Sequence, residues 1–164
     1  MREENITMDA ADQPKEDMGI FFQTLLEHMD AGILLADIKD GQVQVKYLNP
    51  RFVEIVKRTG ADIGVKGENL MAAVHPDYLP GLLAATLASA KDRTSLEYTF
   101  KVYSRRGPGI YAWQHIRGVI LPGEFDGAVR LMAVITDITK LMQSEEKLLT
   151  AEVKYKTVLG QIDS

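Results

Sequence analysis

The spacing of apolar positions predicts three strands in the second half of the chain. In residues 95–103 every second position is apolar, which is typical of a strand with one buried face. Residues 110–121 and 128–138 follow after short turns rich in Gly and Pro, so we expect an antiparallel meander. Residues 131–135 are apolar throughout, which predicts a central strand that is covered on both faces.

A hairpin and a capped helix are predicted earlier in the chain. Two apolar runs, residues 32–37 and 43–48, flank a Lys-Asp-Gly turn at 39–41. Asn49, which is followed by proline, predicts the start of a helix over residues 51–58. Asn is a favoured N-cap, and proline fits the first helical position because its missing N–H would be unpaired there.

Short helices are predicted over residues 61–92, where glycines and prolines interrupt the apolar pattern. Among these interruptions we count Pro80 and Gly81, so the longest of the helices is expected at residues 82–91. This segment is rich in Ala and Leu, which favour helix.

Amphipathic helices are expected at both ends of the domain. In residues 18–29 the apolar side chains, two phenylalanines among them, share one helical face and should cover either the sheet or a second subunit. In residues 140–159 apolar residues recur every seven positions, but two glutamates share the seam. A weak coiled coil and a solvated amphipathic helix both fit that pattern. The seam residues are Leu141, Glu145, Leu148, Glu152, Tyr155, Leu159 and Ile162.

These patterns divide the chain into three parts. Residues 1–17 are polar and highly charged, which predicts a disordered lead-in. Residues 18–139 form one domain, with a lead-in helix at 18–30 and a core at 31–139. Residues 140–164 form an exit helix that leads toward a further domain.

Composition narrows the partners of the chain. It has 164 residues, 46% of them apolar, and a net charge of -4 without a long basic run, so we expect no nucleic-acid partner. The absence of cysteine excludes disulfides, thiolate metal sites and attachment of a chromophore through sulfur. No apolar run reaches the ~20 residues of a membrane helix, so we expect no membrane contact by this segment and a cytoplasmic location.

Catalytic and metal-binding motifs are missing from the sequence. There is no glycine-rich phosphate loop, no Gly-x-Ser-x-Gly and no His-Glu-x-x-His. His28, His75 and His115 lie far apart, and none has a partner at a metal-ligand spacing. We therefore predict a protein that is not an enzyme, with no catalytic residues and no metal site.

Four short stretches, in order and at their spacings, resemble the PAS domain, a sensory module of bacterial signalling proteins. They are Tyr-Leu-Asn-Pro-Arg-Phe at 47–52, Val-His-Pro-Asp-Tyr at 74–78, Tyr-Ala-Trp at 111–113 with Arg-Gly at 117–118, and residues 131–139, which end in Asp-Ile-Thr. The resemblance runs from about Met18 to about Leu149. It implies an α+β fold in which short helices cover one face of a five-stranded antiparallel sheet, between the lead-in helix and the exit helix.

The same resemblance implies a noncatalytic sensor that relays a signal through its exit helix to an output domain in a longer chain. That output domain could be a histidine kinase, as in a two-component system, or a cyclic-dinucleotide enzyme. Members of the family often carry Gly in the last strand where this chain has Ala133, and the extra methyl group should narrow a pocket. We therefore expect no flavin, haem or covalent chromophore, while an unidentified small-molecule ligand and an empty core both stay open.

By resemblance, the ligand pocket lies between the sheet and the short helices, and alternation decides which side chains face it. The candidates are Leu96, Tyr98, Phe100, Gln114, Ile116, Leu131, Ala133 and Ile135. Gln114 is notable because an amide that faces an apolar core needs partners, whether from protein, water or ligand. The set contains no carboxylate and no histidine, which argues against the alternative of a small cavity-containing enzyme or ligand carrier of unrelated fold.

Two further sets of residues complete the hypothesis. A homodimer is expected through the lead-in helix and the outer sheet face, at Phe21, Phe22, Leu25, Trp113, Met132 and Val134. Asp137 and Thr139 stand between the last strand and the exit helix. By resemblance, they couple movement of the strand to the helix, and a helix-capping role for Asp137 is the simpler alternative.

Overall fold

The computed structural model describes residues 15–62, 64 and 67–162. The expected disordered lead-in lies largely outside these residues, although Lys15 to Asp17 already belong to the first helix. In chain order the elements are α1 (Lys15–His28), β1 (Gly32–Lys39), β2 (Gln42–Leu48), α2 (Pro50–Lys57), the 3₁₀ helix η1 (Leu70–Ala73), α3 (Leu79–Asp92), β3 (Leu96–Tyr103), β4 (Tyr111–Ile120), β5 (Val129–Asp137) and α4 (Thr139–Ile162).

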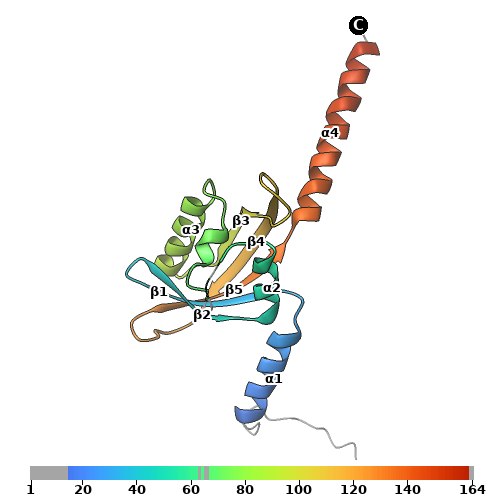
Figure 1. Ribbon diagram of the computed structural model, residues 1–164. Coiled ribbons are helices and arrows are strands. Elements are labelled where there is room, and N and C mark those ends of the chain that lie inside the picture. Colours follow the sequence, from blue (N-terminus) through green and yellow to red (C-terminus); the bar gives the residue numbers. More distant parts are fainter. Residues whose placement is uncertain (1–14, 63, 65–66, 163–164) are drawn as a thin grey trace, which may run out of the picture.

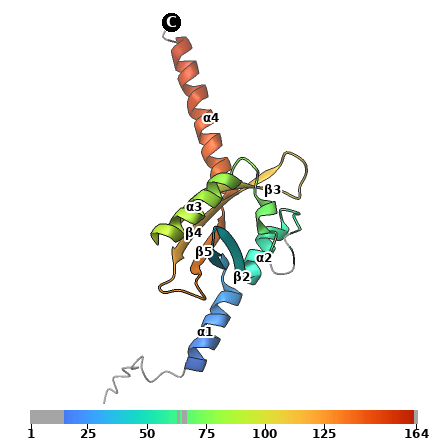
Figure 2. The same ribbon diagram turned by 90° about the vertical axis from the view of Figure 1, so that its left-hand side faces the viewer.

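The strands form one antiparallel sheet in the order β2-β1-β5-β4-β3. The helices α2, η1 and α3 cover one face of it, while α1 and α4 extend away from the sheet in opposite directions (Figures 1 and 2). This is the α+β architecture that the sequence predicts. It leaves the core between a single sheet face and three short helices.

The last strand is central, but it is covered on one face only. Leu131, Ala133 and Ile135 face the helices and are buried, whereas the side chain of Met132 on the other face is 40% exposed. Neither terminal helix lies over the outer face of the sheet, so of the two covers that were possible there, a terminal helix or a partner, only the partner stays a prediction (Figures 1 and 2).

The helix α3 begins before the two residues that were expected to interrupt it. Pro80 occupies the first turn of α3, where a backbone N–H is not needed, so it starts the helix rather than breaking it. Gly81 is required there for another reason. A methyl group at this position would overlap the hydroxyl of Tyr98 on β3, so the missing side chain lets the helix lie close to the sheet.

The hairpin between β1 and β2 turns through two residues in the left-handed conformation. Asp40 has a φ of 52° and Gly41 a φ of 74°. Two consecutive positive φ angles are typical of a tight hairpin turn whose twist matches that of the strands, and Asp-Gly is a preferred sequence for it. The turn thus follows directly from the local sequence.

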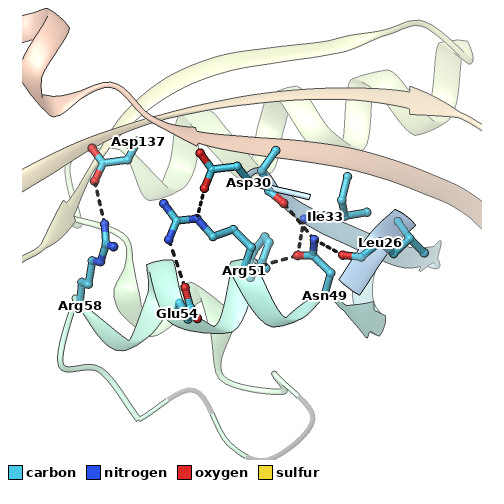
Figure 3. Close-up of polar contacts among 10 residues, drawn as sticks. Leu26, Asp30, Ile33, Asn49, Arg51, Glu54, Arg58 and Asp137 are labelled. Atoms are coloured by element: carbon cyan, nitrogen blue, oxygen red, sulfur yellow. Dashed lines mark hydrogen bonds and ion pairs between the residues drawn. The ribbon is translucent and has the colours of Figure 1, made fainter. Parts of the chain in front are cut away.

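Asn49 joins three elements through one fully buried side chain (Figure 3). Its amide oxygen accepts hydrogen bonds from the backbone N–H of Phe52 (3.0 Å), as expected of an N-cap, and of Ile33 (2.8 Å). Its amide nitrogen donates to the carbonyl oxygens of Leu26 (3.0 Å) and Ala31 (2.9 Å). The side chain therefore links the start of α2 to the start of β1 and to the last turn of α1.

An ion pair links β1 and β5 on the outer face, which the sequence did not suggest. The Arg130 guanidinium donates two hydrogen bonds to the carboxylate of Asp37, at 2.7 and 3.1 Å. It also lies 4.0 Å from the centre of the Phe125 ring in the β4–β5 turn. Hydrogen bonding from Arg130 holds the pKa of the Asp37 carboxyl below its ordinary value.

We expect Asn49→Ala to lower the free energy of unfolding by about 2–4 kcal/mol, because it removes an N-cap and leaves buried backbone groups without partners. Asn49→Asp keeps the acceptor for Phe52 and Ile33 but removes both donated hydrogen bonds, so an intermediate loss is expected. Urea denaturation monitored by circular dichroism measures both variants. An alanine variant within about 0.5 kcal/mol of the parent chain would show that the network is dispensable.

Candidate functional site

A small cavity lies in the core between the sheet and the covering helices. Its volume is about 60 Å³ and its lining is almost wholly apolar. Five of the eight predicted pocket residues line it: Phe100, Gln114, Ile116, Leu131 and Ile135. Leu96 and Ala133 are buried in the core away from the cavity, and Tyr98 packs beneath the first turn of α3 at Gly81.

The remaining lining residues come from elements whose packing the sequence did not settle. The helix α2 contributes Phe52 and Val56, which lie on its predicted apolar face, and α3 contributes Leu82 and Thr86. The strands and the η1 segment complete the wall with Leu34, Val43, Leu70, Met71, Ala73, Val74 and Val102, and Thr59 lies just after α2. The apolar stripe of α2 was a usable signal for two of these residues. The positions from η1 and α3 carried none, because a helix face does not reveal where along the sheet it packs.

The threonine hydroxyl groups of the cavity donate hydrogen bonds to nearby backbone carbonyls. Thr59 donates to the carbonyl of Val56 (2.7 Å), and Thr86 donates to that of Leu82 (2.8 Å). The Gln114 side chain is only 3% exposed and makes no hydrogen bond to the residues that the structure describes. It stands on the wall that separates the cavity from an open cleft at the end of the sheet.

The volume of the cavity limits what it holds in this conformation. The cavity measures about 60 Å³, whereas an apolar cavity of ~150 Å³ is known to bind benzene. Sites for metabolite-sized ligands measure about 300–1,000 Å³. A bulky ligand would therefore enter this core only if the covering helices moved outward.

His75 lies outside the cavity, at the edge of the sheet. Its Nδ1 atom accepts a hydrogen bond from the backbone N–H of Asp77 (3.1 Å), and its ring packs against Tyr111 with centroids 4.9 Å apart. The His-Pro-Asp segment therefore acts as a local structural turn. Among the described residues, no group of three or more His, Cys, Asp or Glu side chains is arranged to hold a metal ion.

Trp113 on the outer face is half-buried by an aromatic cluster that the sequence did not predict. The segment before α3 pairs with the edge of β3, where the N–H of His75 donates to the carbonyl of Lys101 (2.9 Å). The Tyr78 ring packs edge-on against Trp113 at 5.7 Å, and the Lys101 ammonium lies 4.9 Å from the Trp113 ring centre. Trp113 is thus partly covered from within the chain, unlike Met132.

The joint between β5 and α4 is held to a second strand. The Asp137 carboxylate accepts hydrogen bonds from the backbone N–H (2.9 Å) and the hydroxyl (2.6 Å) of Thr139, the first residue of α4. The Thr139 hydroxyl accepts from the N–H of Trp113 (2.9 Å), and the N–H of Ile138 donates to the Trp113 carbonyl (2.9 Å). The start of β4 therefore shares the joint between β5 and α4 with residues 137–139.

The helix α2 lies between this joint and the end of α1 (Figure 3). Next to the Asn49 network, Arg51 pairs with the exposed Asp30 (Nε to Oδ1, 3.3 Å), and at the other end Arg58 lies 4.0 Å from the Asp137 carboxylate. Polar contacts thus connect the lead-in helix, α2 and the exit helix along one side of the domain.

Residues 20–87 match a family model described as a PAS domain. Over this segment the chain is similar to PAS domains. No curated protein matches the chain. No helix among the described residues is long and apolar enough to cross a membrane.

Solved structures share the PAS fold at low sequence identity. A sensory box histidine kinase/response regulator from Burkholderia thailandensis is 24% identical with a TM-score of 0.57, over 83% of this chain and 98% of that one. The N-terminal domain of a diguanylate cyclase with a PAS/PAC sensor from Marinobacter aquaeolei is 17% identical with a TM-score of 0.50, over 67% and 98%. An RNA-binding light-oxygen-voltage receptor is 14% identical with a TM-score of 0.67, over 88% of this chain but only 40% of its own.

We expect the purified PAS domain to carry no flavin, haem or covalent chromophore. The core cavity is too small for such groups, His75 does not line it, and the chain has no cysteine. An absorption spectrum of protein made in cofactor-replete cells, beside mass spectrometry of the material released on unfolding, measures this. A visible band at near-stoichiometric occupancy would contradict the expectation.

Proposed function

We propose that this PAS domain is a noncatalytic sensory module that passes a signal through α4 to an output domain of a longer chain. The observation that carries the proposal is the position of β5. Its inward residues Leu131 and Ile135 line the core cavity, its outward residue Met132 is open to a partner, and its end runs directly into α4.

The position of β5 makes the strand able to respond to both faces of the sheet. A small molecule that enlarges the cavity would press on Leu131 and Ile135, and a second subunit on the outer face would press on Met132. Either displacement reaches Asp137 along the same strand. Because Ile138 and Thr139 are hydrogen-bonded to Trp113, a shift between β4 and β5 changes the contacts at the first turn of α4.

The chemistry of the core supports a role without catalysis. Gln114 and two threonines are the polar residues among those that line the cavity, and no carboxylate, histidine or lysine joins them. General acid–base or nucleophilic catalysis needs such groups within reach of a substrate. Similar solved structures come from a sensory box histidine kinase/response regulator and from a diguanylate cyclase, which supports an output domain of either class.

The apolar surface that is exposed on the single chain favours a homodimer. On α1 the side chains of Phe21, Phe22 and Leu25 are 57%, 53% and 46% exposed, and Met132 on the outer sheet face is 40% exposed. Exposed apolar residues are also spread along α4, at Leu141, Leu148, Leu149, Val153, Tyr155, Val158 and Leu159. Large contiguous apolar patches are rare on monomers, so we infer that a second copy covers part of this surface.

We expect replacement of both Phe21 and Phe22 by glutamine to shift the protein from dimer toward monomer in light scattering, because the change removes two large apolar side chains from the proposed interface. Ile20→Gln is the matched control, since Ile20 is exposed on the same helix but lies off the apolar stripe. A parent chain that is already monomeric at high micromolar concentration would reject the dimer.

We expect Asp137→Ala to leave the PAS domain folded while it changes the output of the full-length protein. The substitution removes the contacts to Thr139 and Arg58, which are worth about 1 kcal/mol beside a domain stability of about 5–15 kcal/mol. That amount still shifts a two-state helix equilibrium about fivefold. Thermal melting of the domain beside an output assay in the parent protein measures the two effects.

Two further variants isolate the cause. Asp137→Asn keeps an oxygen that can accept from Thr139 but removes the charge that faces Arg58. Thr136→Ala alters an exposed neighbour on the same strand and serves as the control. Unchanged output in Asp137→Ala with a modest loss in melting temperature would mean that Asp137 only stabilises the start of α4.

A further inference from the structure

A cleft of about 710 Å³ opens beside the exit joint, on the side of the sheet end where α2 stops. Its walls come from segments that are distant in sequence: the end of α2, the β3–β4 turn with the strand ends beside it, the end of β5 and the first turn of α4.

Positively charged side chains predominate in this cleft. Lys57, Arg58, Arg105, Arg106 and Lys140 line it, and Asp137 is the one acidic residue among the lining residues. Arg58 lies 4.0 Å from Asp137, and the other four cations form no ion pair with any residue that the structure describes. The whole chain carries a net charge of -4, so its average composition does not account for this cluster.

The backbone holds the cationic segments together. The N–H of Arg105 donates to the carbonyl of Arg58 at 2.8 Å, which ties the β3–β4 turn to the end of α2. The Arg105 side chain packs over Gly60, and the N–H of Arg106 donates to the Ser104 hydroxyl at 3.3 Å. Favourable interaction with the C-terminal end of α2 would account for Lys57 alone, and it does not account for two arginines in a turn.

We propose that this cleft binds a small, multiply charged anion that carries phosphate or carboxylate groups. Arginines in a fixed arrangement are suited to such groups, because a guanidinium donates paired, charge-assisted hydrogen bonds to their oxygens. An anion in the cleft competes with Asp137 for Arg58 and so acts on the contacts at the start of α4. Gln114, Thr59 and Val102 line both the cleft and the core cavity, which places this site against the cavity wall.

The site does not depend on the relay role proposed above. Binding is measured on the 164-residue chain itself, whereas the relay needs the output of the parent protein. Isothermal titration calorimetry with inorganic pyrophosphate, and separately with citrate, tests the two anion chemistries. Low ionic strength is used because salt screens exposed charges.

We expect saturable binding of at least one of the two anions. Arg105→Gln combined with Arg106→Gln should weaken it about tenfold, because two charge-assisted contacts are lost. Asp137→Asn should tighten it about threefold, since the competing carboxylate is removed. Arg117→Gln is the control, because Arg117 is an exposed arginine outside the cleft. The affinity of this variant for the anion should stay within about twofold of that of the parent chain.

Several results would overturn the proposal. One is the absence of saturable binding of both anions to the parent chain. Another is an equal loss in Arg117→Gln and in the double variant, which would mean a general charge effect. An unchanged affinity in Asp137→Asn would refute the competition for Arg58. If the double variant melts well below the parent chain, Lys140→Gln on the first turn of α4 removes a cleft charge independently and must weaken binding.

Discussion

The fold depends on one buried amide. Asn49 is fully buried, and its four side-chain hydrogen bonds satisfy backbone groups at the start of α2, the start of β1 and the last turn of α1. Each of those groups would otherwise be short of a partner where water has little access, at a cost of about 1–3 kcal/mol. Because one rigid side chain serves all three segments, the direction in which α1 leaves the core is coupled to the position of α2.

The helix α2 carries this coupling toward the other end of the domain. Its apolar face presses Phe52 and Val56 against the sheet and lines the core cavity, and Arg58, just after its last turn, faces Asp137. A contact at the exit joint and a contact at the end of α1 are therefore made by the two ends of one short helix. Through these contacts, a small displacement of α2 would change the polar contacts at the end of α1 and at the start of α4.

The apolar cavity, the cationic cleft and the apolar outer surface of the domain lie in different places. The core is tightly filled and leaves about 60 Å³, whereas the larger cleft beside α4 is lined by cations and is open to solvent. The outer sheet face is apolar around Met132 and is closed near Trp113 by Tyr78. The proposed anion site, the proposed dimer surface and the exit helix therefore lie at different places on one sheet, and both the anion site and α4 adjoin the end of β5.

Features that depend only on neighbouring residues could be predicted from the sequence. Alternation placed Phe100, Ile116 and Leu131 on the buried face, and Asp-Gly and Asn-Pro predicted the hairpin turn and the start of α2. These features follow from the period of a strand and from local backbone preferences, so no distant contact is needed to predict them.

Which of the inward residues line the cavity depends on the packed fold, because periodicity predicts the face on which a side chain lies and not the residues that it contacts. It also brought together groups that are far apart in the chain. Arg130 meets Asp37, and the cations of residues 57–58, 105–106 and 140 share one cleft. The place of Gly81 inside α3 has the same cause, since the close approach of Tyr98 that favours glycine there exists only in the packed domain.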